Sequence, residues 1–220
     1  MDLLSDFGGT LLEQYIKGGP TMHPISALSI VAVALIFYKI HVFRKANTDI
    51  EALVAGVRRH VMAGNVKKAL ETCEGHRGPV AVTLKVGLLH SDSSSEEIER
   101  HIEAAAISSI AYLQRYLGGL ATISNIAPLI GFFGTVVGMI LSFDAIAIGG
   151  MGNPGLVAKG ISVALLTTAF GLLVAVMTQP FYNYFIGRVA EYGNQIEIAT
   201  HSLLYVLNRR KQIARSEAGP

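Results

Sequence analysis

The sequence contains few charged residues, no tryptophan and a single cysteine. Charged residues make up 15% of the 220 positions and hydrophobic residues 51%, which is too little charge for an ordinary soluble domain. The lone Cys73 excludes an intramolecular disulfide and a cysteine-based metal site, so we expect an inert thiol there. A formal net charge of +2 does not provide the concentrated basic face that nucleic acid needs. The composition predicts a small membrane protein with several spans and no nucleic acid partner.

The chain also lacks the motifs of common enzymes. It has no Walker sequence, no GxSxG and no paired carboxylates, and its seven histidines show no HxxxH or HExxH spacing. Residues 150–155 match GxGxxG, but no strand pattern precedes them and Pro154 interrupts the motif, which favours a turn. We therefore expect a protein that is not an enzyme, with no metal site and no cofactor.

Three apolar runs are long enough to cross a membrane. Residues 117–143 and 160–187 contain no charged residue, and each exceeds the roughly 20 residues that a spanning helix needs. Residues 20–43 form a third run, in which Lys39 is expected to extend along its aliphatic stem toward the interface. The sequence predicts an all-α membrane protein with three transmembrane helices.

The distribution of Lys and Arg predicts the orientation. Basic residues follow the first and third runs, whereas the loop after the second run contains only Lys159. By the positive-inside rule, the N-terminus lies outside and the C-terminus inside. Binding of anionic lipid is an alternative role for the basic clusters, compatible with this topology. The predicted order is a periplasmic or interfacial segment (1–19), transmembrane helix 1 (20–43), a cytoplasmic helical region (44–110), transmembrane helix 2 (111–143), a periplasmic loop (144–159), transmembrane helix 3 (160–187) and a cytoplasmic C-terminal helix and tail (188–220).

Long helical extensions are expected on the cytoplasmic side. Ser94 and Glu97 have the spacing of a capping box, and the apolar stripe that follows runs into the second span without a break. A similar stripe leaves the third span and continues to about Arg215. A chain this small is expected to be unable to bury both stripes alone, so they predict association with other copies or a partner. Chain breaks are expected at Gly18-Gly19-Pro20, Gly64, Gly75 and Gly78-Pro79.

Small residues are frequent in the second and third runs. Gly134 and Gly138 form a GxxxG step, which lets two helix backbones approach closely. Close packing alone is one interpretation; the other is a wet interior, because Thr135 and Thr168 are interleaved with the small residues. The expected packing or pore positions are Pro128, Gly131, Gly134, Gly138, Ala164 and Gly171.

These runs resemble a known family. The segments ATISNIAPLIGFFGTVVGMILSF (121–143) and KGISVALLTTAFGLLVAV (159–176) look like the core of the ExbB/TolQ/MotA proton-channel family, closest to its ExbB and TolQ branch. The resemblance covers roughly residues 105–190. It implies a subunit of an inner-membrane motor driven by the proton motive force, with either H⁺ or Na⁺ as the transported ion.

The resemblance also implies partners and site residues. It implies a homopentameric ring around two copies of an ExbD/TolR-like single-span protein with a transmembrane aspartate, and a TonB/TolA-like protein that spans the periplasm. Thr135 and Thr168 match the family threonines that line the ion pathway. A hydroxyl can solvate a charge that another chain brings in. The alternative is that each hydroxyl bonds back to a carbonyl one turn earlier, at Gly131 and Ala164.

The chain departs from the family pattern at Val163. Members of the ExbB and TolQ branch usually have a glutamate at this position, so the carboxylate that the resemblance implies in the third span is absent here. Asp144 is the nearest carboxylate, and it is a candidate for the mouth of an entry route or an ordinary interface residue. A non-conducting structural ring that anchors an envelope complex is the alternative function. A solute transporter is disfavoured, because the chain shows no internal repeat.

Overall fold

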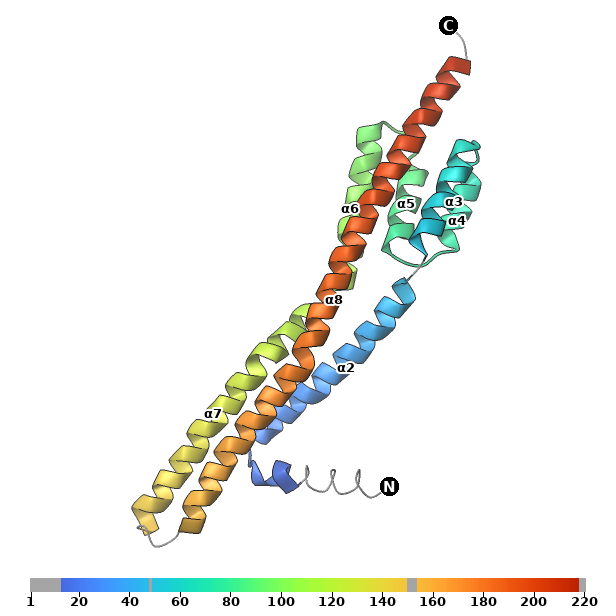
Figure 1. The fold of residues 1–220 in the computed structure, drawn as a ribbon. Coiled ribbons are helices and arrows are strands. Elements are labelled where there is room, and N and C mark those ends of the chain that lie inside the picture. The colour runs from blue at the N-terminus through green and yellow to red at the C-terminus, as the bar shows by residue number, and fades with distance from the viewer. Residues whose placement is uncertain (1–12, 48, 150–153, 218–220) are drawn as a thin grey trace, which may run out of the picture. The chain divides into compact units, whose positions relative to one another are not determined.

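The computed structural model describes residues 13–47, 49–149 and 154–217, and these residues form helices without any strand. The chain divides into two compact units, which are described separately. The first unit comprises Met1–Phe37 and Tyr116–Asn183, and the second comprises Tyr38–Arg115 and Tyr184–Pro220. The helices are α2 (Met22–Ala46), α3 (Ile50–Met62), α4 (Val66–Glu74), α5 (Pro79–Leu89), α6 (Ser95–Gln114), α7 (Leu117–Gly149) and α8 (Pro154–Glu217) (Figure 1).

Among the described residues, three helical segments are long and apolar enough to cross a membrane. They contain α2, α7 and α8. The prediction of an all-helical protein with three long apolar helices is therefore confirmed. The helices around the loop are longer than expected, since α7 continues to Gly149 and α8 begins at Pro154. The turn predicted for the GxGxxG match lies largely at residues 150–153, outside the described residues.

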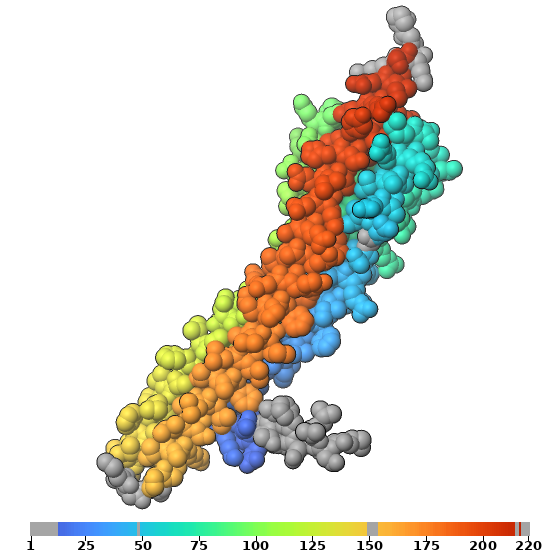
Figure 2. Space-filling model, in the orientation of Figure 1, coloured from blue at the N-terminus to red at the C-terminus, as the bar shows by residue number. Residues whose placement is uncertain are grey.

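In the first unit, α7 and the beginning of α8 lie side by side, and their side chains meet along the pair (Figures 1 and 2). A helical turn at residues 13–17 ends at the predicted glycine break, where Gly19 adopts a φ of +72°. Only glycine adopts this backbone conformation without strain. The rest of the predicted N-terminal segment, residues 1–12, lies outside the described residues. The core of this unit contains Met22, Ile25, Ala32, Ile123, Ala127 and Val174.

The short helices of the second unit begin and end where the sequence predicts. Ser94 caps α6, because its side chain accepts a hydrogen bond from the Glu97 N–H at 3.3 Å. Gly64 follows α3 with a φ of +80°, and Gly78 precedes α5 with a φ of +138°. The helix start at Ser94 and the breaks at Gly64 and Gly78 are thus confirmed.

The two apolar stripes of the second unit pack against each other within one chain. Ile98 and Ile102 of α6 and Ile196 and Leu203 of α8 belong to one buried cluster. The cluster also contains side chains of α3, α4 and α5, such as Leu84, which is 1% exposed. The stripes are therefore buried within one chain, because the small helices between them supply the missing apolar surface. They do not by themselves call for a second copy or a partner.

Helix α6 does not continue into α7, although the stripe between them is continuous. It ends at Gln114, and Tyr116 has a φ of +67°, which an aromatic residue rarely adopts. Lys39 supplies a physical reason within the second unit, since its Nζ donates to the Leu113 carbonyl oxygen at 2.6 Å. A cation stabilises the carbonyl groups at a helix C-terminus. Lys39 is only 1% exposed, so the expectation that it extends to the interface is wrong.

Candidate functional site along the seam of α7 and α8

The candidate site is the seam, which we define as the line of contact through Gly131, Gly134, Gly138, Gly160 and Gly171. A Cβ atom built on Gly131 would lie 2.8 Å from the Thr167 carbonyl oxygen, and one on Gly171 would lie 2.6 Å from the Ala127 carbonyl oxygen. At Gly138, the Gly160 carbonyl oxygen would be 2.6 Å away. Backbone atoms cannot move aside as a side chain can, so these positions require glycine. The sequence feature that predicts close packing therefore corresponds to direct backbone contact.

Among the described residues, hydrogen bonds join α7 and α8 at three places along the seam. The Thr168 hydroxyl donates to the Gly131 carbonyl oxygen at 3.1 Å. The Ser142 hydroxyl lies 3.0 Å from the Val157 carbonyl oxygen. The Ser124 hydroxyl lies 2.7 Å from Oε1 of Gln179, whose amide donates in turn to Asn183 at 3.1 Å. The sequence analysis did not predict a role for Ser124, Ser142 and Gln179. Their polar side chains within charge-free apolar runs could have indicated hydrogen bonds between the helices.

The three threonines near the seam have different partners. Thr167 is fully buried, and its hydroxyl lies 3.0 Å from the carbonyl oxygens of both Val163 and Ala164 on its own helix. Thr135 is half-buried, and it donates to the Phe132 carbonyl oxygen at 2.5 Å. Thr168 is also half-buried, but it bonds across to α7 rather than back to Ala164. The Thr168 hydroxyl thus bonds to the other helix, whereas the hydroxyl of its neighbour Thr167 bonds within α8.

Val163 is packed inside the first unit. It is 8% exposed, and a Cβ built on Gly19 would lie 3.9 Å from its Cγ1. The N-terminal turn therefore lies against the position where the resemblance would place a glutamate. An ionised carboxylate in this setting would need a charged or hydrogen-bonding partner. The valine fits the apolar surroundings that it has.

Pro128 and Asp144 both lie within α7. Pro128 has no N–H, so the helix lacks one backbone hydrogen bond to the Ser124 carbonyl there. Asp144 is exposed and lies five residues before the end of the helix at Gly149. The hydroxyls of Thr135 and Thr168 bond to neither Pro128 nor Asp144 but to the Phe132 and Gly131 carbonyl oxygens.

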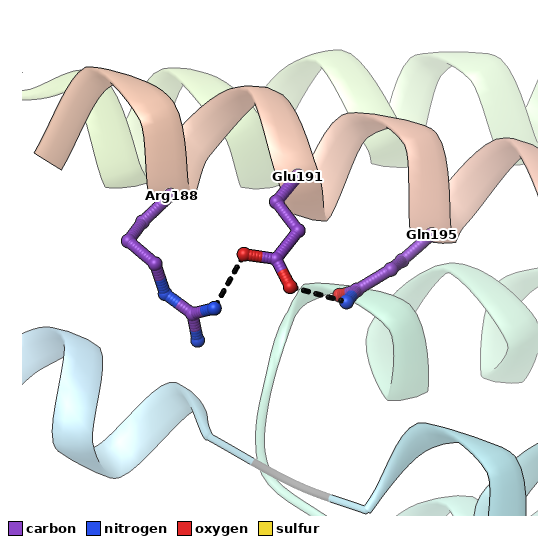
Figure 3. A network of polar contacts seen from close by, with 3 residues as sticks. All are labelled: Arg188, Glu191 and Gln195. Carbon is purple, nitrogen blue, oxygen red and sulfur yellow. Dashed lines mark hydrogen bonds and ion pairs between the residues drawn. The ribbon is translucent and has the colours of Figure 1, made fainter. Parts of the chain in front are cut away.

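Beyond the first unit, α8 carries a polar group in the second unit. Arg188 forms an ion pair with Glu191, which also accepts a hydrogen bond from Gln195 at 3.2 Å (Figure 3). All three side chains belong to α8 (Figure 3). Exposed ion pairs of this kind contribute about 0 to 1 kcal/mol, so this group adds little to stability.

The apolar helices and the glycine and threonine seam define the class as a helical membrane protein whose spans pack through backbone contact. The model of the MotA/TolQ/ExbB proton channel family matches residues 58–198, more than half of the chain. The chain belongs to this family. The match includes the whole seam and most of the second unit.

Individual relatives agree with this family assignment. A protein described as an ExbB homologue in Methanothermobacter thermautotrophicus is 31% identical over 199 residues, covering 90% of this chain and 71% of the relative. The biopolymer transport protein ExbB of Salmonella typhimurium is 41% identical over 108 residues, covering 49% of this chain and 43% of the relative. The Tol-Pal system protein TolQ of Pseudomonas aeruginosa is 32% identical over 117 residues, covering 50% of this chain and 51% of the relative.

Proposed function

We propose that this chain is an ExbB/TolQ-like subunit of an inner-membrane motor driven by the proton motive force. In this proposal it forms a ring, a homopentamer, around an ExbD/TolR-like partner whose transmembrane aspartate takes up and releases the ion. Membership of the proton channel family and the similarity to ExbB and TolQ support this function. A TonB/TolA-like protein would transmit the work to the cell envelope, for import, envelope maintenance or motility.

The observation that carries the proposal is the position of Thr168. Its hydroxyl bridges the two helices and is half-buried, and it lies in a stretch without any Asp, Glu, Lys or Arg. While it donates to Gly131, its oxygen can still accept a hydrogen bond from water or coordinate a cation. Rotation of the hydroxyl would instead let it donate to a carboxylate on a partner helix. Thr168 can therefore solvate both a moving ion and the group that carries it.

Thr135 and the small residues have supporting roles in this proposal. Thr135 is half-buried, so its oxygen is accessible beside the same helix pair. Glycine at the seam lets α7 and α8 approach closely, so the helix pair is narrow where a partner helix would move past it. Each elementary charge that crosses 100 mV releases about 2.3 kcal/mol, which is enough to bias the rotation of a loosely packed helix. Asp144 is a candidate for the entry of the ion.

The proposed topology places the N-terminus and residues 144–159 outside, and residues 44–110 and 188–220 in the cytoplasm. The excess of Lys and Arg after the first and third spans supports it. In that arrangement the second unit is largely cytoplasmic. Large apolar side chains on α7 and α8, including Leu129, Phe132 and Leu172, are at least half exposed and would contact lipid, other copies or the partner.

A non-conducting structural ring is the second candidate function, and the buried Val163 at the family glutamate position favours it. Substitution of Thr168 by valine separates the two candidates. A motor subunit should keep its native mass in mild detergent, with its partner bound, and lose ion flux by tenfold or more in proteoliposomes. A structural ring should show no flux in either form.

Thr167→Val is the matched control, because among the described residues the Thr167 hydroxyl bonds to carbonyls of its own helix and not to α7. It should leave both the mass and the flux unchanged. Equal loss of flux in the two variants would mean that helix packing, and not solvation by Thr168, limits conduction. A monomer, or a ring without a partner under conditions that preserve the complex of a relative, would contradict the motor.

A further inference from the structure

The second unit contains a groove of about 670 Å³ that the proposed ion pathway does not use. It is lined by the last turns of α2, the first turn of α5 and the end of α6. Lys45 and His41 contribute from α2, and His76 and Arg77 contribute from the link before α5. The groove therefore collects positive and titratable side chains from two separate segments.

The charge of this groove is one-sided. Among the residues that the structure describes, no aspartate or glutamate lines it. A second groove of similar size, about 630 Å³, lies in the same unit and has a mixed lining with Glu51, Arg58 and Arg59. The absence of carboxylates from the lining of the first groove favours an anionic ligand, and the second groove provides an internal comparison.

The same groove has an aromatic and apolar part. Tyr38 is 42% exposed and Tyr112 is 57% exposed, and both line it together with Val42 and Val82. It lies where the apolar run of α2 ends and the basic residues begin. Tyrosine and lysine are enriched at this level of a membrane, where hydrocarbon gives way to headgroups. The ligand should therefore have an apolar body next to its negative charge.

We propose that this groove binds an anionic phospholipid. Lys45 and Arg77 contact the phosphate of the headgroup, and Tyr38 and Tyr112 pack against the glycerol and the beginning of the acyl chains. Gly78 at the start of α5 adds no side chain to the groove, and no side chain caps that helix end. A lipid fits better than an acidic peptide, because the groove adjoins an apolar membrane-spanning run. This site is independent of the ion pathway and does not require the motor.

A tryptophan reporter tests the proposal, because the chain contains no other tryptophan. The full chain with Tyr112→Trp is reconstituted in vesicles that contain brominated phosphatidylglycerol or brominated phosphatidylcholine. We expect quenching at a lower mole fraction of the anionic lipid. The matched reporter is Ile198→Trp, since Ile198 lines the second groove and is 70% exposed. It should show no preference between the two lipids.

Variants that change the charge of the groove then show whether its cations cause the preference for the anionic lipid. Lys45→Gln with Arg77→Gln should lower the preference for phosphatidylglycerol about fivefold for each cation removed. Lys45→Arg with Arg77→Lys should retain it, and Arg58→Gln with Arg59→Gln in the second groove should not change it. Equal quenching by the two lipids, or an unchanged preference after removal of Lys45 and Arg77, would overturn the proposal.

Two competitors distinguish other ligands. Glycerol phosphate and polyglutamate are added to the Tyr112→Trp chain in phosphatidylglycerol vesicles. We expect neither to relieve quenching at millimolar concentration, because neither brings acyl chains to the groove. Relief by glycerol phosphate would indicate a site for a free phosphate, and relief by polyglutamate would indicate a site for an acidic peptide. Either result would overturn the lipid assignment.

Discussion

The seam of the first unit and the core of the second unit are packed in opposite ways. Along the seam, α7 and α8 meet through glycine, and threonine and serine hydroxyls bridge them. In the second unit, the helices meet through large aliphatic side chains such as Leu53, Leu84 and Leu88, each at most 1% exposed. Both regions are helical, so secondary structure does not explain the difference in packing. The surroundings of the two regions do.

Under the proposed topology the physical reason is the solvent, since the second unit lies largely in water and the seam lies in lipid. In water, burial of a leucine side chain stabilises a core by about 1.5 to 3 kcal/mol. Lipid tails are as apolar as leucine, so this driving force is absent between membrane helices, and close backbone contact and hydrogen bonds replace it. A glycine at the seam is therefore as important for packing as a leucine in the second unit.

Gly138→Ala should produce the largest effect. Its Cβ would lie 2.6 Å from the Gly160 carbonyl oxygen and 2.7 Å from the Ala164 nitrogen, so the helices must separate. We expect a loss of about 3 kcal/mol, measured as a lower Tm in detergent. Gly118→Ala is the control, because nothing lies within 4 Å of a Cβ built there. Similar Tm values for the two variants would mean that the seam is not tightly packed.

The thiol of Cys73 should report how well the second unit excludes water. Burial raises the pKa of the Cys73 thiol from its ordinary value of 9.0 to about 11. The folded chain then keeps its proton while the unfolded chain loses it, so stability falls as pH rises from about 9 to about 11. We expect a loss of about 2 kcal/mol in urea unfolding, which should be absent in Cys73→Ala. The same pH slope in both chains would show that other groups cause it.

Gly87→Ala should have the smallest effect of the three, although it is the same substitution as Gly138→Ala. Its Cβ would meet Ile102 Cδ1 at 2.6 Å and Leu203 Cδ2 at 2.8 Å, which are the ends of flexible side chains. These side chains can move, so we expect a loss of about 1 kcal/mol in the same Tm measurement. A larger loss than for Gly138→Ala would mean that the seam is not the region that tolerates an added Cβ less well.

Much of the local structure could be predicted from the sequence. The capping box at Ser94, the glycine breaks at Gly64 and Gly78, and the three apolar runs all depend on residues close together in the chain. The candidate site was predicted only in part. Thr135 and Thr168 could be proposed from the resemblance, but Ser124, Ser142 and Gln179 bond to groups 15 to 55 residues away, so their partners could not be inferred from spacing.

The class of this protein follows from local properties of the sequence, because run length, charge-free composition and the spacing of small residues indicate which surfaces meet lipid. Packing between distant segments decided that the two stripes of the second unit bury each other, and that Lys39 donates to a carbonyl at the end of α6 instead of extending outward. It also decided that Thr168 bridges two helices while Thr167 does not. Each of these outcomes depends on which distant segment supplies the neighbouring atoms, and that is set by packing in three dimensions.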